Sequence, residues 1–174
     1  FLKHENIIIL ADDIYEHIHW AEDPFCSIAT ACPKLYDRVL TINGVSKCYA
    51  MTGWRIGYAG GPARIIKAMK TIQSQITSNP CSISQVAAAA ALDGDQSFMS
   101  ERLDAYRRRS DYVVAALNDV PGFECRKGEG AFYAFPSIAP TGLDEETFAE
   151  QLLLEERVAV VPGSAFGEAC RGHV

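Results

Sequence analysis

The chain has 174 residues, of which 48% are hydrophobic, and it carries a formal net charge of -6 at pH 7. The length suits one domain or a domain and a half, the apolar fraction is enough to bury a core and excludes a disordered chain, and the acidic balance argues against nucleic acid as a partner. Six scattered cysteines without a CxxC pair predict reduced thiols in the cytoplasm, and the longest run of small apolar residues, 86–92, is too short to span a membrane.

The first expected element is a strand over residues 7–11, an unbroken apolar run that two aspartates follow. Such a run predicts a parallel strand that is buried on both faces. Ligands of open α/β sheets bind at the carboxyl ends of the strands, so Asp12 and Tyr15 are candidate binding residues. The alternative for Asp12 is that its carboxylate only caps a turn.

Two histidines, His17 and His19, follow these acids. If they lie on a short strand, the alternation of side chains places both on one face, where imidazoles and carboxylates can bind a metal. No second ligand cluster accompanies them in the sequence, so we favour solvated or hydrogen-bonded histidines and expect no metal site.

The next expected strand, over residues 39–42, leads into a segment over residues 43–58 that reads NGVSKCYAMTGWRIGY. This segment places Lys47 in a loop of small residues and Arg55 between two glycines. A lysine amine can hold an aldehyde cofactor, and the planar guanidinium of an arginine can bind a phosphate through two hydrogen bonds. The alternative is a solvated loop lysine and a surface arginine, but the two features together favour a binding site.

These residues resemble the cofactor-lysine segment of class I, fold type I, pyridoxal-phosphate-dependent aminotransferases, and among them the bacterial aspartate aminotransferases most. The resemblance runs from about Asp12 to the end of the chain. It implies that Lys47 holds pyridoxal 5'-phosphate as a Schiff base, that Asp12 keeps the pyridine nitrogen protonated, that Tyr15 lies beside the ring oxygen and that Arg55 binds the phosphate. The family usually has a phosphate-binding serine where this chain has Gly44, so phosphate binding rests more on Arg55 and on groups outside this chain.

Three helices are expected after a strand over residues 56–59. The apolar spacing predicts an amphipathic helix over 65–76, an alanine-rich buried helix over 84–92 and a long helix over 99–117 that links two domains. Ser78 and Asn79 lie in the turn after the first helix. They resemble the Ser-Asn-Pro segment that approaches the partner subunit's active site in the family, although the sequence alone indicates only a turn.

Short strands and one further helix are expected in the last part of the chain. Residues 123–126 and 131–135 flank a Gly-Glu-Gly turn and predict a hairpin, a helix is expected from Asp144 to about Glu156, and residues 158–161 predict another strand. Phe132 resembles a residue of the family's small-domain strand that lines the substrate pocket, with a plain core position as the alternative. The arginines at 107–109 are expected to form a solvated face rather than a phosphate site.

The sequence therefore predicts an α/β fold that resembles the C-terminal half of a longer protein. Residues 1–95 would be the second part of a mainly parallel-sheet cofactor domain, and residues 96–174 a linking helix and an incomplete small α+β domain. The resemblance implies an aminotransferase that moves an amino group between aspartate, or a similar amino acid, and a 2-oxo acid, as a cytoplasmic homodimer. Lys47 would act as general acid and base.

Two alternatives to this function stay open. One is another enzyme on the same cofactor, a lyase or a decarboxylase, which would use the same binding residues. The other is a non-catalytic fragment, because the family's earlier half and its substrate-carboxylate arginine do not occur in these 174 residues. For the same reason we expect the 174-residue chain on its own to be inactive.

Overall fold

The computed structural model describes residues 1–4 and 6–174. The chain forms two compact units, Phe1–Leu103 and Asp104–Val174, and the boundary between them falls within helix α4, Phe98–Asn118. The sequence places the boundary at 95/96, just before this helix. The assignment of the two parts to a large and a small domain stays a prediction.

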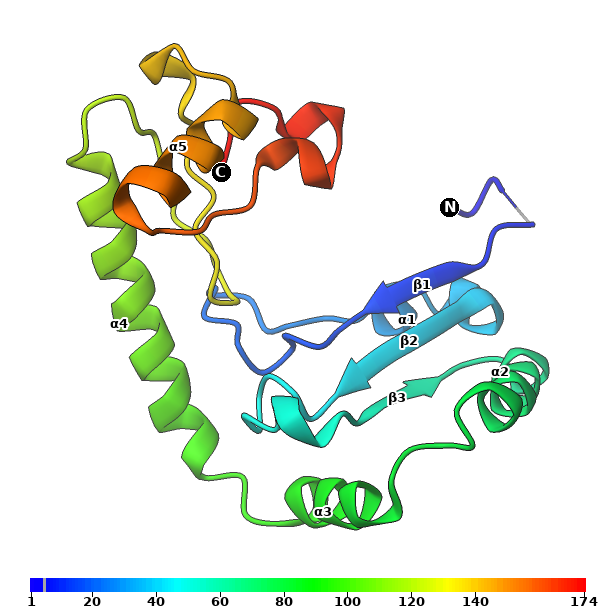
Figure 1. The fold of residues 1–174 in the computed structure, drawn as a ribbon. Helices are drawn as coiled ribbons and strands as arrows, with labels where there is room; N and C mark the ends of the chain where they lie inside the picture. The colour runs from blue at the N-terminus through cyan, green and yellow to red at the C-terminus, as the bar shows by residue number, and fades with distance from the viewer. Residues whose placement is uncertain (5) are drawn as a thin grey trace. The chain divides into compact units, whose positions relative to one another are not determined.

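The first unit contains a sheet whose described strands have the order β1-β2-β3 (Figure 1). The strands are β1 Ile9–Asp12, β2 Val39–Gly44 and β3 Gly57–Gly60. Strand β2 pairs in parallel with β1, where Asp12 lies opposite Ile42, and antiparallel with β3, where Gly44 lies opposite Gly57. Parallel pairing brings the carboxyl ends of β1 and β2 to one edge of the sheet, so the loops that follow them start side by side.

Strand β1 is shorter and more exposed than the sequence predicts. Ile9 packs against Leu35 and Val39, beneath the short helix α1, Ile28–Ala31. Leu10 points to the opposite face and leaves 64% of its surface exposed. The prediction of a strand buried on both faces is therefore wrong, because an apolar run reports the hydrophobicity of a strand and not the layers that cover it.

The two helices that follow the sheet are α2, Ala63–Ile76, and α3, Ser82–Asp93, and both were predicted. Helix α3 is not the buried helix that its alanines suggest, since Ile83 and Val86 are each 71% exposed. It contacts the core through Ala88, which packs against Val45 and Ile56. This small cluster lies directly behind the loop that carries Lys47, and it supports that loop from one side.

The second unit contains the remainder of α4 and helix α5, Glu145–Glu156. Asp144 caps α5, because its Oδ1 accepts the backbone N–H groups of Glu146 at 3.1 Å and Thr147 at 2.9 Å. A carboxylate in this position also interacts favourably with the positive end of the helix dipole. The predicted start and end of this helix are confirmed.

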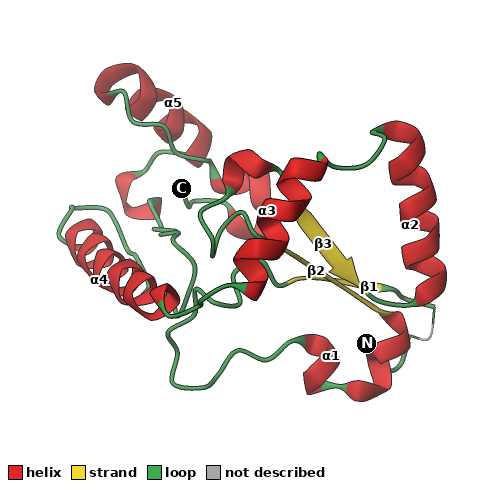
Figure 2. Cartoon of the chain, turned by 90° about the horizontal axis from the view of Figure 1, so that it is seen from below, coloured by secondary structure: helices red, strands yellow, loops and turns green. Residues whose placement is uncertain are grey.

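The strands predicted for the second unit are wrong, and the strands of the described residues lie in the first unit (Figure 2). In place of the hairpin over 123–135 there is an isolated bridge between Glu124 and Ser137. Ala131 has a φ of 58°, which interrupts an extended strand. Residues 158–161 line an apolar groove of about 860 Å³ instead of pairing with a neighbouring strand. Their apolar character reflects this groove and not a sheet.

Among the residues that the structure describes, none belongs to a helix with the length and hydrophobicity needed to cross a bilayer.

Candidate functional site

Two loops leave the sheet at the shared edge of β1 and β2, and they carry the candidate residues. We name residues 12–18 the aspartate loop and residues 45–51 the lysine loop. Asp12 is the last residue of β1, and its exposed side chain accepts the backbone N–H of Ile14 through Oδ1 at 3.3 Å. The turn cap that was the alternative role of Asp12 is therefore present. It occupies one carboxylate oxygen, and a carboxylate has lone pairs on two oxygens, so the cap is compatible with ligand binding.

Three hydrogen bonds tie the aspartate loop to the end of β2 and to the lysine loop. The N–H of Asp13 donates to the carbonyl of Ile42 at 2.9 Å and extends the parallel ladder. The side-chain amide of Asn43 donates to the carboxylate of Glu16 at 2.6 Å. The thiol of Cys48 donates to the backbone carbonyl of Ile14 at 3.5 Å. The positions of Asp12 and Lys47 are thus coupled through their loops.

The lysine loop is also closed on itself. Val45 is fully buried, and its carbonyl accepts the N–H of Met51 at 3.3 Å. Within the loop, the N–H of Ala50 donates to the carbonyl of Lys47 at 3.2 Å, and Ala50 has a φ of 53°. Lys47 itself is half-buried. A short loop with these internal bonds presents its lysine from a fixed backbone.

Two residues that sequence reasoning missed anchor the residues after Lys47. Arg102 donates to the carbonyl of Cys48 at 2.7 Å, and the phenol of Tyr49 donates to Gln96 at 2.9 Å. Burial raises the pKa of the Cys48 thiol and of the Tyr49 phenol. Neither Arg102 nor Gln96 lies in a motif, and both are far from the loop in sequence, so no local signal identifies them.

Gly44 stands where the resembled family usually has a serine, and the structure gives a reason for the glycine. A Cβ on Gly44 would lie 3.0 Å from the carbonyl oxygen of Ile56 and 3.3 Å from the Cα of Gly57. Both contacts are with the backbone of the neighbouring strand, which cannot turn away as a flexible side chain can. A serine at this position would require a shift of β3.

Arg55 links the lysine loop to β3 through a 3-10 helix, Thr52–Trp54. It adopts the left-handed conformation, with φ 55° and ψ 48°, and its Nη1 donates to the carbonyl of Thr52 at 2.9 Å. The left-handed region is uncommon for a residue with a long side chain and costs roughly 1 kcal/mol or more, and such strained residues are concentrated at functional sites. The exposed side chain of Arg55 is available to an anion.

The other three candidate residues lie apart from these loops in sequence. Ser78 and Asn79 are exposed and occupy two consecutive left-handed positions, with φ 57° and 73°, between α2 and α3. Phe132 belongs to the second unit, where its ring lies 5.6 Å from that of Tyr106 and 5.1 Å from that of Tyr133. The structure therefore brings Asp12, Tyr15 and Lys47 to one sheet edge, and it describes Phe132 in a separate unit.

His17 lies in a turn and His19 at an isolated bridge position, so the two do not share the short strand that was considered for them and the alternation argument does not apply. His17 lies 3.4 Å from the Glu16 carboxylate, and His19 forms a hydrogen bond with the carbonyl of Asp23 at 2.9 Å. Within residues 1–4 and 6–174, no group of three or more His, Cys, Asp or Glu side chains is arranged to hold a metal ion.

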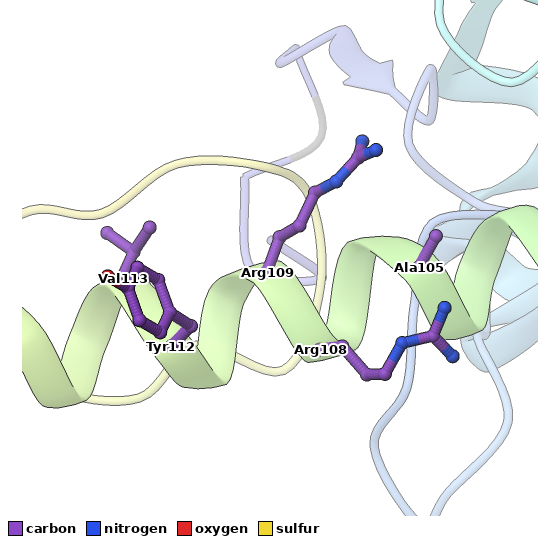
Figure 3. Close-up of a pocket in the computed structure, with 5 residues that line it drawn as sticks. All are labelled: Ala105, Arg108, Arg109, Tyr112 and Val113. Atoms are coloured by element: carbon purple, nitrogen blue, oxygen red, sulfur yellow. The ribbon is translucent and has the colours of Figure 1, made fainter.

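The arginine run on α4 borders a shallow hollow of about 400 Å³ (Figure 3). The side chains of Arg108 and Arg109 leave the helix in different directions, so their guanidinium groups do not converge on one anion. Both are exposed. This arrangement supports the interpretation of the run as a solvated face.

Comparison with known proteins extends over the whole chain. The family model for aminotransferase class I and II matches residues 1–174. The aspartate/prephenate aminotransferase of Nitrosomonas europaea is 50% identical over 99% of this chain, and the aspartate aminotransferase of Rhizobium meliloti is 52% identical over 95% of it. The chain spans less than half of these curated relatives, 46% and 43% of their lengths.

Solved structures give the same result for the fold. The crystal structure of the aspartate aminotransferase from Rhizobium meliloti matches with a TM-score of 0.89 and 49% identity over 99% of this chain and 46% of its own. The aromatic aminotransferase from Pyrococcus horikoshii matches with a TM-score of 0.91 and 41% identity over the same shares, 99% and 46%. Because the family model covers every residue and these folds agree, the chain belongs to the class I and II aminotransferases.

Proposed function

We propose that the protein containing this chain is a pyridoxal-phosphate-dependent aminotransferase that moves an amino group between aspartate, or a similar amino acid, and a 2-oxo acid. The observation that carries the proposal is the coupling of the aspartate loop to the end of β2 and to the lysine loop at one sheet edge, through the bonds from Asn43 to Glu16 and from Cys48 to Ile14. The names of the relatives, which include aspartate and aspartate/prephenate aminotransferases, support the substrate class.

The side chains at this edge fit the cofactor by their chemistry. Pyridoxal 5'-phosphate has an aldehyde, a pyridine nitrogen and a phosphate, and the chain offers an amine at Lys47, a carboxylate at Asp12 and a guanidinium at Arg55. Asp12 and Lys47 follow adjacent parallel strands, where α/β sheets bind ligands. When bound, the cofactor supplies an aldehyde for amines and a ring that accepts electrons from the substrate.

Each residue then has a distinct task. Lys47 would hold the cofactor aldehyde through its amine and, as general acid and base, would move the proton of the substrate α-carbon. The Asp12 carboxylate would stabilise the protonated pyridine nitrogen, and the Tyr15 phenol would donate to the ring oxygen. Arg55 binds the phosphate through its planar fork. Phe132 lines the substrate pocket from the small domain, and Ser78 and Asn79 approach the active site of the partner subunit.

The organisation of the whole protein is part of the proposal. Residues 1–95 belong to a large cofactor domain of fold type I, and residues 96–174 to a linking helix and a small domain, which the division of the chain into two compact units supports. The protein acts as a homodimer. A cytoplasmic location is supported by six cysteines that are all free thiols.

Lys47→Ala in the complete gene product tests the central assignment. Incubation with pyridoxal 5'-phosphate and borohydride should add the mass of one reduced cofactor to the wild-type peptide containing Lys47, and Lys47→Ala should lose this adduct and the transamination of aspartate with 2-oxoglutarate. Lys70→Ala, on the exposed face of α2, is the matched control and should keep both. An adduct that persists at another lysine in Lys47→Ala would show that the assignment is wrong. Product formed without any 2-oxo acid would indicate a lyase or a decarboxylase instead.

A further inference from the structure

Asn43 has a buried side-chain amide, and both its Nδ2 and its Oδ1 are hydrogen-bonded. It lies near the end of β2 and is 9% exposed. Its Nδ2 donates to Glu16 Oε1 at 2.6 Å, and its Oδ1 accepts the backbone N–H of Gly44 at 2.7 Å. Buried amides without partners are strongly unfavourable, so this side chain fixes the relative position of everything that it contacts.

Each partner of this hydrogen bond is close in sequence to a candidate site residue. Glu16 lies in the aspartate loop shortly after Asp12 and Tyr15, and Asn43 lies shortly before Lys47. Other hydrogen bonds between the same segments include a backbone bond at the base of the loops and a bond from the Cys48 thiol, and a thiol is a weak donor. A hydrogen bond to a carboxylate is stronger and shorter than a neutral one. The bridge between Asn43 and Glu16 is therefore a strong side-chain link between the aspartate loop and the end of β2, just before the lysine loop.

The neighbours of Glu16 are consistent with a carboxylate facing this edge of the sheet. His17 lies 3.4 Å from its Oε1. Burial raises the pKa of the Tyr58 phenol, and the charge of Glu16 raises it further; burial and then Glu16 likewise raise the pKa of Asp13. Tyr58 lies opposite Asn43, on the strand β3 that pairs with β2.

We propose that Glu16 and Asn43 are a positioning pair, whose hydrogen bond sets the distance between the Asp12 carboxylate and the Lys47 amine so that one planar cofactor can reach both. This inference rests on the proposed function. Neither residue needs to touch the cofactor. A change in the bridge moves one loop relative to the other, and a misplacement of reacting groups by about 1 Å can lower a rate on the order of 100-fold.

The chain allows a reversal of this hydrogen bond, which is the sharpest test. In Asn43→Asp two carboxylates face each other at the bridge and repel, while the bond from Gly44 is kept. In the double variant Glu16→Gln/Asn43→Asp the introduced glutamine donates to the introduced aspartate, so the bridge is restored with donor and acceptor exchanged. Glu22→Gln, an exposed carboxylate of the same unit, is the control.

The variants are compared in the complete gene product by cofactor affinity, by the pH titration of the bound cofactor's absorbance, by kcat and KM, and by Tm. We expect Asn43→Asp to lower kcat by about 10- to 100-fold at pH 8. Part of the loss should disappear at lower pH, because one proton shared by the two carboxylates re-forms the bridge. The double variant should recover to within a few-fold of wild type and regain the wild-type titration of the absorbance.

The results for these variants test the positioning role separately from the proposed function. Wild-type affinity, titration and kcat in Asn43→Asp, or a double variant as impaired as the single one, would overturn the positioning role. If Asn43→Asp does not fold, Glu16→Ala, which breaks the bond from the loop side, is judged by the same measurements. A wild-type protein that binds no cofactor would overturn the proposed function, and it is distinguishable because that result precedes any variant.

Discussion

The lysine loop and residues 130–133 both resemble segments of this family, but they are held in place by different forces. Directed hydrogen bonds fix the lysine loop, including those from Arg102 to Cys48 at 2.7 Å and from Tyr49 to Gln96 at 2.9 Å. Ring contacts hold the aromatic segment, where Phe132 lies 5.6 Å from Tyr106. Hydrogen bonds weaken steeply with distance and angle, whereas ring pairs tolerate several geometries. Substitutions near the lysine loop should therefore have larger effects than those in the aromatic segment.

After the loss of transamination expected for Lys47→Ala, the largest effect is expected at Asp12. Asp12→Asn keeps an oxygen that can accept the N–H of Ile14, so the turn remains, but it removes the charge that we propose stabilises the protonated pyridine nitrogen. We expect its stability to be close to wild type and its turnover to fall on the order of 100-fold. Asp12→Ala should lose as much turnover and also the cap, and Asp12→Glu should be much milder. Steady-state kinetics with Tm measurements separate these effects, and wild-type rates in Asp12→Asn would rule out the electrostatic role.

The next effect is expected at Gly44, where a serine would restore the family's usual residue. Because the added Cβ would meet Ile56 O at 3.0 Å, Gly44→Ser should lower the free energy of unfolding by about 1–3 kcal/mol, in the range of other overpacking changes. Gly60→Ser is the control, since a Cβ on Gly60 meets nothing within 4 Å. Chemical denaturation measures both. An equal loss in the two variants would mean that strand propensity, and not the contact with β3, limits this position.

A smaller and chemical effect distinguishes two thiols of the first unit. Cys48 is buried beside Lys47, and burial raises its pKa, whereas Cys81 is exposed and the N–H groups of Ser84 and Ile83 lower its pKa. The thiolate is the reactive form, so at pH 7 iodoacetamide should label Cys81 before Cys48, and the rate at Cys81 should level off at a lower pH. Peptide mass spectrometry at several pH values checks this order. Faster labelling of Cys48 would show that the lysine loop is open in solution.

The smallest effect is expected at Phe132. Phe132→Leu keeps an apolar side chain but loses the ring contacts with Tyr106 and Tyr133, which should cost about 0.5–1.5 kcal/mol in the free energy of unfolding. If Phe132 lines the substrate pocket, KM for aspartate should change while cofactor affinity stays the same. A change in stability with no change in KM would identify Phe132 as a core residue only.

The predictions from sequence succeeded where a feature depends on neighbouring residues, and they failed where it depends on residues far apart in the chain. The start of α5 at Asp144 and the strand that leads to Lys47 depend on neighbouring residues, and the structure confirms both. The hairpin over 123–135 failed because the φ of Ala131 is a tertiary property that composition does not reveal. The contacts of Arg102 with the lysine loop were missed because a single arginine on a helix gives no periodic signal.

The candidate site shows the same limit. The types of its chemical groups, at Asp12, Lys47 and Arg55, were readable from short motifs whose residues are close in sequence. The hydrogen bond between Glu16 and Asn43 was not readable from the sequence. A glutamate in a turn and an asparagine near the end of a strand are common, and only the pairing of β1 with β2 brings these two together. Sequence patterns indicate which groups take part, and the sheet determines how far apart they are.

The pairing of β1 with β2 also has a consequence for the order of folding. The segment between these strands must close before Asp13 can bond to Ile42 and Glu16 to Asn43, and closing a loop has an entropic cost that only these later contacts offset. The contacts between the lysine loop and the aspartate loop, such as that from Cys48 to Ile14, therefore depend on the pairing of these strands. In a nascent or unfolded copy of the chain Lys47 is an ordinary amine, with no special reactivity toward the free aldehydes of the cell.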